Sequence, residues 1–257
     1  MTSFPDDAFL EEARAAMTEW EQRKKEMQER KDAVKKEYLQ AVANGRNGID
    51  LSMVHTAHAL RGVVYNKEYD SILRVLDKAV LPTGHTFDIE PCDMEGDSLG
   101  DTSKTFVLRP DGARDESIFE YFQFEDSCTG AWQAFLLHQM WHYLPLWWHA
   151  NYDERTYVYT KEDLSGTFLG KAMVDPRARR YMHMLGSEID SLDVDALDLS
   201  PEIVRNKGVY YVSCCFWTDF GGLKREYVKI VLTDGRLDEF FEFDRGTLYE
   251  YNCGILF

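Results

Sequence analysis

Residues 209–243, with the sequence VYYVSCCFWTDFGGLKREYVKIVLTDGRLDEFFEF, decide the fold of this chain. They hold three β-rich runs, Val209–Trp217, Lys224–Thr233 and Arg236–Phe243, and short turns that contain glycine separate these runs. Turns of this kind join antiparallel neighbours. A fourth run, Thr247–Phe257, follows another such turn at Asp244-Arg245-Gly246. The C-terminus is therefore predicted to be a four-strand β-meander.

One face of this sheet is expected to be buried. The third run sets polar residues against apolar ones: Arg236, Asp238 and Glu242 against Leu237, Phe241 and Phe243. A half-polar antiparallel sheet of this kind packs its apolar face under helices. Periodicity and capping residues predict helices at 3–44, 50–80, 127–143 and 175–185, a short helix from Ser200, and strands at 85–90, 104–109, 116–124 and 156–160. The fold class is thus α+β, with a long N-terminal helix and further helices packed on an antiparallel sheet.

The charge of the chain is unevenly spread. The 257 residues hold 45 Asp and Glu against 29 Lys and Arg, and the formal charge is -16. Residues 1–48 are almost neutral, so we interpret them as a helical arm and residues 49–257 as an acidic α+β body, with an internal boundary near 161–207 as an alternative. Three windows carry the excess of acid: 86–126, 187–206 and 234–250. Such a balance disfavours a binder of duplex DNA or of anionic membranes, which needs a basic face.

The chain is expected to be cytoplasmic. The acidic N-terminus does not resemble a secretory signal, and the most apolar window, 131–148, is interrupted by polar residues and a proline. The five cysteines are scattered, without a C-x-x-C pair, and reduced thiols are the expectation.

The N-terminal helix has a coiled-coil-like heptad pattern. At 1.5 Å per residue it would be about 60 Å long. The a positions are Leu10, Met17, Lys24, Lys31 and Tyr38, and the d positions are Ala13, Trp20, Met27, Val34 and Ala41. Two lysine layers disfavour a tight parallel dimer. Three arrangements stay open: the helix packs on its own body, it associates with a partner or with a second copy in antiparallel fashion, or it is a free arm. In the second case, Trp20, Met27 and Val34 are the interaction residues.

The best enzymatic signal is the pair His138 and His142. Their i,i+4 spacing on the predicted helix 127–143 sets both imidazoles on one face, beside small residues. A zinc site would need a third ligand, for which the candidates are His149, Glu120, Asp126 and His183. The motif lacks the glutamate of H-E-x-x-H proteases. His55 and His58, an i,i+3 pair on another helix, could complete such a site if the two helices pack together.

Three other groups are candidate binding sites. An acidic patch is formed by Asp93, Glu95, Asp97 and Asp101, although the spacing does not fit a calcium-binding EF-hand. Trp147 and Trp148 belong to an aromatic cluster that suits either a core or an interface. Arg177, Arg179 and Arg180 form a basic group that could hold a phosphate or a carboxylate.

We therefore expect a non-enzymatic interaction or regulatory protein without a cofactor, which binds a basic macromolecular partner. An inhibitor or a mimic of nucleic acid would be a special case. The first alternative is a metal-assisted hydrolase centred on His138 and His142, with a divalent metal as its cofactor. The second is a module that binds a small ligand in an aromatic pocket.

Overall fold

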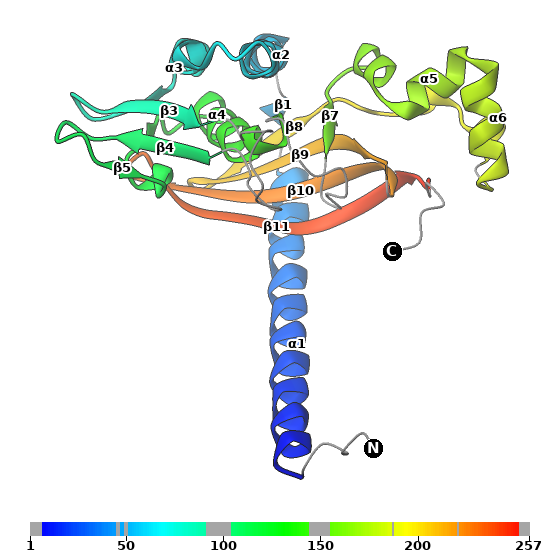
Figure 1. Ribbon diagram of the computed structural model, residues 1–257, viewed down its shortest axis with the longest axis horizontal. Helices are drawn as coiled ribbons and strands as arrows, with labels where there is room; N and C mark the ends of the chain where they lie inside the picture. The colour runs from blue at the N-terminus through cyan, green and yellow to red at the C-terminus, as the bar shows by residue number, and fades with distance from the viewer. Residues whose placement is uncertain are drawn as a thin grey trace, which may run out of the picture.

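A six-stranded antiparallel sheet organises the chain (Figure 1). The computed structural model describes residues 7–44, 47–48, 51–90, 104–143, 155–186, 188–219 and 221–251. The strands of this sheet are β1 (Asn47–Gly48), β7 (Thr156–Val158), β8 (Glu202–Asn206), β9 (Val209–Thr218), β10 (Gly222–Thr233) and β11 (Arg236–Tyr249). Strands β7 and β8 pair with the two ends of β9, and β10 pairs with its other edge.

The predicted α+β class and the four-strand antiparallel sheet at the C-terminus are confirmed, since β8, β9, β10 and β11 are consecutive neighbours. The strand boundaries differ from the prediction at two places. Asp244-Arg245-Gly246 is not a turn, because these residues continue β11 and pair with Arg225, Glu226 and Tyr227 of β10. The segment from Ser200 contains strand β8, where a short helix was predicted.

Two tight turns set the register of this meander. Lys207 and Gly208 between β8 and β9 have φ values of 52° and 78°, and Asp234 and Gly235 between β10 and β11 have 49° and 79°. Positive φ at both central residues is the requirement of a type I′ turn, whose twist matches that of paired strands.

One face of the sheet is covered by helices and forms the main core. Helix α4 (Cys128–Gln139) continues into the 3-10 turn η3 (Met140–Tyr143), and α2 (Leu51–Tyr65), η1 (Tyr69–Ser71) and α3 (Ile72–Val75) lie above it. Trp132, which is fully buried, donates from Nε1 to the carbonyl of Met53 at 2.8 Å and so joins α4 to α2.

Short strands close the side of this core. Strands β3 (Thr86–Glu90), β4 (Lys104–Leu108) and β5 (Arg114–Asp115) form one small sheet, and β2 (Ala79–Val80) pairs with β6 (Gln123–Phe124). The predicted strand 116–124 is interrupted by a 3-10 turn, η2 (Ile118–Glu120), and only its end is extended, as β6. Its buried residues Ile118 and Phe122 are four apart, a spacing that suits a helical turn.

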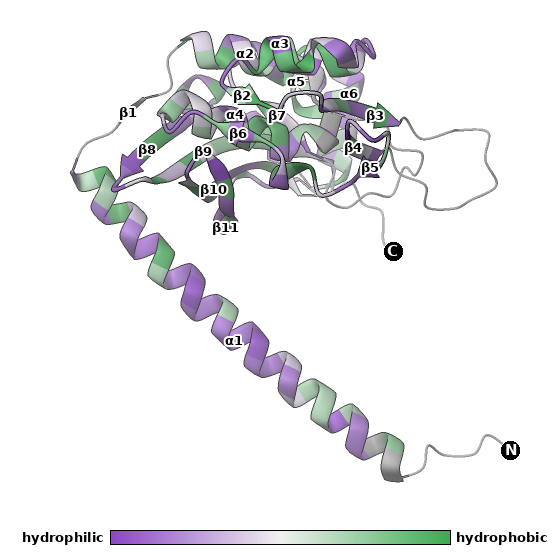
Figure 2. Cartoon of the chain, turned by 90° about the vertical axis from the view of Figure 1, so that its left-hand side faces the viewer, coloured by the Kyte–Doolittle hydropathy of each residue, from purple (hydrophilic) through white to green (hydrophobic). Residues whose placement is uncertain are grey.

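The long helix α1 (Asp7–Ala43) meets the opposite face of the sheet. Val34 and Ala41 are buried there against Val204, Tyr211, Phe241 and Phe243, and Tyr38 packs beside them. The first half of α1 stands away from the rest of the molecule, as both views show (Figures 1 and 2). The helix is therefore packed on its own body along one half and projects from it along the other.

A second group of helices covers the face of the sheet that α1 also meets, at the other end of the strands. It consists of η4 (Glu162–Gly166), α5 (Phe168–Val174), α6 (Pro176–Met184), η5 (Ile189–Ser191) and η6 (Val194–Ala196), packed on Cys215, Trp217, Leu223 and Tyr249. Asp175 caps α6 by accepting from the backbone N–H of Arg177 at 2.8 Å, and Pro176 takes the first helical position, as predicted. Within the described residues, no helix is long and apolar enough to cross a membrane.

Candidate functional site

The projecting half of α1 has large apolar side chains in solvent. Phe9, Met17, Trp20 and Met27 are 59%, 64%, 61% and 45% exposed. Along the heptad Met17, Trp20 and Met27 lie on the stripe that continues into the buried Val34, which packs on the sheet of its own chain, and Phe9 flanks this stripe at a g position. Single exposed apolar residues are ordinary, whereas an aligned set of them marks a surface that can be covered.

The second half of α1 is fixed to the sheet by charge as well as by packing. Arg30 donates to Glu239 at 2.8 Å and its guanidinium lies 3.9 Å from the centroid of the Phe241 ring. Lys35 pairs with Asp244 at 2.6 Å. The sheet therefore sets the direction of the projecting half. Residues 7–29 extend from this anchor, and from here on the name arm refers to these residues alone.

The acidic windows of the sequence meet in pairs at the two ends of β11. At the end that begins with Asp234 and Gly235, the turn lies beside Glu125 and Asp126 of the first window in a cavity of about 440 Å³. At the other end, Glu250 lies beside residues of the 187–206 window. At about 3.3 Å per residue the 14-residue strand separates these two places by roughly 45 Å. Among the described residues, members of the three windows thus contribute to two acidic surfaces.

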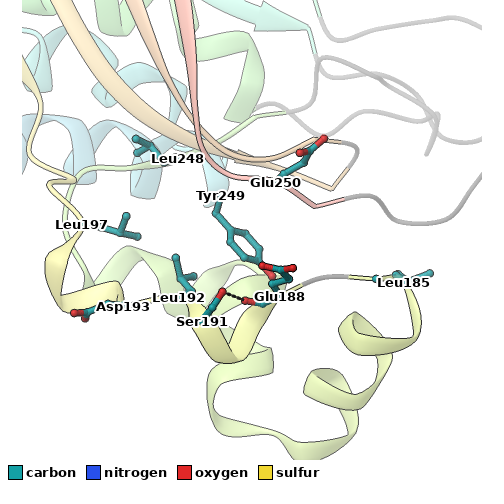
Figure 3. A pocket seen from close by; sticks show the side chains of 10 residues that line it. Leu185, Glu188, Ser191, Leu192, Asp193, Leu197, Leu248, Tyr249 and Glu250 are labelled. Carbon is teal, nitrogen blue, oxygen red and sulfur yellow. Dashed lines mark hydrogen bonds between the residues drawn. The ribbon is translucent and has the colours of Figure 1, made fainter.

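The second of these surfaces surrounds a cavity of about 680 Å³, which we call the acidic pocket. Its described lining holds three carboxylates, Glu188, Asp193 and Glu250, and no lysine, arginine or histidine. Its apolar lining consists of Leu185, Leu192, Leu197, Leu248 and Tyr249. Tyr249 projects from the end of β11 toward the segment that carries Glu188 and Ser191 (Figure 3).

The carboxylates of the acidic pocket differ in what they already bind. Asp193 caps η6 by accepting from the backbone N–H of Asp195 at 3.0 Å and of Ala196 at 3.3 Å. Glu188 and Glu250 are exposed, and within the described part of the chain neither lies within ion-pair distance of a base. These two side chains are therefore available to a cation from outside.

The predicted histidine pair lies in the main core beside charged residues. His138 stacks on Phe240 with the ring centroids 3.5 Å apart and the planes within 3°. His142 belongs to the 3-10 turn η3, so the two rings are not aligned as in a continuous α-helix. Burial first, and then the Arg155 cation, lower the pKa of His138 to about 4 and that of His142 to about 3. Both imidazoles are neutral at pH 7.

Under these histidines lies a network of four charged side chains, from Arg155 directly before β7 and from strands β10 and β11. Arg155 forms an ion pair with Glu226 and a second with Glu242 at 3.2 Å, and Arg245 donates to Glu242 at 2.7 and 2.9 Å. The Tyr157 hydroxyl donates to Glu226 at 2.8 Å. Two cations and two carboxylates thus compensate each other inside the protein, which is the arrangement that buried charge requires.

Burial acts on both carboxylates of this network, with opposite outcomes. It raises the pKa of Glu226 to about 7, although the charge of Arg155 and the hydrogen bond from Tyr157 act in the opposite direction. For Glu242, burial is outweighed by the hydrogen bond and the charge of Arg245 and by Arg155, and its pKa is lowered.

The second predicted histidine pair does not join the first. His55 is exposed, and His58 contacts Asp163 through Nε2 at 3.0 Å. Asp163 also accepts from Arg61 at 3.1 Å and from the backbone N–H groups of Tyr159 and Thr160. This carboxylate therefore clamps α2 to the segment after β7.

The remaining candidate residues do not come together in one site. Arg179 and His183 pair with Asp190 at 3.0 and 3.1 Å, while Arg177 and its neighbours lie on the exposed α6. Asp126 binds Arg205 at 3.0 Å and Tyr210 at 2.5 Å. The acidic patch residues and the tryptophan cluster lie outside the described residues: Asp93, Glu95, Asp97, Asp101, Trp147, Trp148 and the ligand candidate His149.

No group of three His, Cys, Asp or Glu side chains among the described residues could hold a metal ion. No protein-family model, curated protein or solved structure matches this chain.

The buried network is the group of residues that sequence reasoning missed. Arg155 and Glu242 are 87 residues apart in the sequence and meet only through strand pairing. One signal was present in the sequence. Glu226 lies on the same side of β10 as the buried Val228 and Ile230, so a carboxylate occupies a core position of the alternating pattern.

Proposed function

We propose that this chain is a non-enzymatic interaction protein that binds a basic segment of another protein in the acidic pocket. The observation that carries the proposal is the lining of this pocket, which combines the carboxylates of Glu188, Asp193 and Glu250 with leucine side chains. A lysine or arginine side chain matches such a lining, because its aliphatic stem packs on apolar surface while its charged end reaches the carboxylates. The excess of acid in the body adds long-range attraction for a cationic partner.

The arrangement of the buried charges supports the non-enzymatic part of the proposal. Each member of the Arg155, Glu226, Glu242 and Arg245 network is engaged with an oppositely charged neighbour within the described structure. His138 is stacked on Phe240 with a pKa far below 7. Side chains that compensate one another in this way stabilise a core.

The test uses a fluorescently labelled peptide of alternating lysine and leucine pairs, with a glutamate and leucine peptide of the same length for comparison. We expect the basic peptide alone to bind the full chain. Its dissociation constant should rise by about tenfold or more between 50 and 300 mM salt, since the attraction is between exposed charges. Binding that is unchanged by salt would contradict the proposal.

A pair of variants locates the binding site. Glu188→Gln with Glu250→Gln removes two charges from the acidic pocket, and Glu68→Gln with Asp70→Asn removes two exposed charges on another part of the body. We expect the first variant to weaken binding about tenfold, a loss of about 1.4 kcal/mol, and the second to leave it nearly unchanged. Equal losses in both variants would show that the peptide senses only net charge and would exclude the acidic pocket as the site.

A further inference from the structure

The arm has an apolar stripe that is built in the same way as the part of α1 already in contact with the sheet. Trp20 and Met27 are spaced by seven residues, as are Val34 and Ala41, and all four occupy d positions. The second pair is buried at 5% and 2% exposure, whereas the first pair is exposed. The side chain of Lys24 lies 5.1 Å from the centre of the Trp20 ring, which is still 61% exposed. The stripe of the arm thus presents a surface that nothing in the described structure covers.

The flanks of the arm keep it helical without a contact to the body. Arg23 pairs with Glu19 at 2.5 Å, and Gln28 donates to Asp32 at 2.9 Å, both across one turn of the helix. Pairs of this spacing each stabilise a helix by about 0.2–0.5 kcal/mol. The apolar stripe is therefore presented on a rod that has its own local support.

A parallel dimer does not suit the arm. In a parallel pair each a position faces itself, so Lys24 would lie against Lys24 of the second copy in the centre of the seam. An antiparallel pair sets a positions against d positions instead. With Met17 opposite Trp20 of the second copy, the same register sets the long Lys24 opposite the small Ala13. The lysine stem can then pass over the alanine and bring its ammonium group to solvent.

The charges beside the seam match in this register. The flanking e positions bring Arg14 opposite Glu21 of the second copy, and the two-fold symmetry repeats this pair. Two oppositely charged pairs therefore flank the central layers of Met17 and Trp20. The register also sets residue 30 opposite residue 7, so the paired section ends where Arg30 makes contact with the sheet.

We propose that the arm binds a second copy of this chain as an antiparallel helical pair, with Met17 of each copy opposite Trp20 of the other. The two bodies lie at opposite ends of the paired rods, and each acidic pocket stays open. The resulting dimer presents two acidic bodies, which raises the avidity for a partner with two basic segments. This inference concerns the arm alone and does not depend on the partner proposed for the acidic pocket.

Sedimentation equilibrium of the full chain tests the association. We expect a dimer whose dissociation constant rises by about tenfold or more for Trp20→Glu, since a charged side chain would be buried in the central layer. Ala15→Glu adds the same charge on the opposite side of the arm and should leave the dimer intact. A wild-type chain that is monomeric up to about 1 mM would overturn the proposal. At that limit the binding free energy would be weaker than about -4 kcal/mol.

Charge exchange and cross-linking test the register. Arg14→Glu alone and Glu21→Arg alone should each weaken the dimer, and the double variant should restore it. A mixture of Ala13→Cys chains and Lys24→Cys chains should form a disulfide-linked dimer, whereas neither variant should do so by itself. A cross-link in the Ala13→Cys chain alone would establish a parallel pair and contradict the proposed geometry. Peptide binding at the acidic pocket is measured separately, so the failure of either proposal leaves the other one testable.

Discussion

Arg155 and Glu226 form an ion pair in which both side chains are withdrawn from water, at 5% and 0% exposure. Arg155 directly precedes β7, so the pair connects this strand to β10, which is not its neighbour because β9 lies between them. Its partner Glu242 on β11 extends the connection across the sheet. The network thus links three strands through side chains in addition to the backbone ladder.

Removal of one partner of this pair should be far more costly than removal of both. We expect Arg155→Met to lower the free energy of unfolding by about 3–5 kcal/mol at pH 8, because it leaves the Glu226 carboxylate buried without its cation. Arg155→Met combined with Glu226→Met should cost much less than the sum of the single variants. Urea unfolding of the four proteins gives the coupling energy. A coupling energy near zero would mean that the two residues act independently.

The raised pKa of Glu226 predicts a specific pH dependence of stability. Its folded pKa is about 7 against an ordinary value of 4.5, so the folded state binds the proton more tightly. The resulting contribution is fully present below pH 4.5 and is lost as the pH rises through 7. Relative to Glu226→Gln, the wild type should lose up to about 3 kcal/mol between these limits. A difference between the two proteins that is independent of pH would contradict the shift.

The fold was predictable where local signals and strand pairing agree. The β-rich runs of β9 and β10, the glycine-containing turns and the Asp175-Pro176 helix start all act over a few residues. The prediction failed at Asp244-Arg245-Gly246, whose composition favours a turn. There the pairing with the 12-residue β10 outweighs local preference and keeps β11 extended.

The candidate sites were less predictable because they depend on distant segments. The acidic pocket needs the 3-10 turn η5 beside the end of β11, and no local pattern joins Glu188 to Glu250. Helix α1 is the contrary case. Its stripe was visible in the heptad pattern, but only the sheet contacts of Val34 reveal which part is already covered.

The stacked His138 predicts sensitivity to acid. Its folded pKa of about 4 lies below the ordinary value of 6.5, so the contribution of this residue is present above pH 6.5 and is lost as the pH falls through 4. His138→Phe keeps a ring on Phe240 and removes the titration. We expect this variant to lose about 3 kcal/mol less than the wild type between pH 6.5 and 4, measured by urea unfolding.

A comparison with His138→Ala separates packing from titration. The alanine variant loses the stack on Phe240, which lies 3.5 Å away, and should be destabilised by about 2–4 kcal/mol at pH 7. If His138 instead held a metal, both variants would lose bound metal, and His138→Phe would be as unstable as His138→Ala. Metal analysis of the purified proteins distinguishes these outcomes.

The turn between β10 and β11 allows the strain of a backbone conformation to be separated from a steric clash. Gly235 has φ of 79°, and a Cβ added there would lie 2.9 Å from the carbonyl oxygen of Phe124. Gly112 has φ of 83° with no atom within 4 Å of such a Cβ. We expect Gly112→Ala to cost about 1 kcal/mol through φ alone. Gly235→Ala should cost roughly 1–3 kcal/mol more, because it also crowds the contact in which the Phe124 N–H donates to the Gly235 carbonyl at 2.6 Å. Equal losses of unfolding free energy in urea would show that β6 shifts freely, and that the meander and the β2–β6 pair are not joined at this turn.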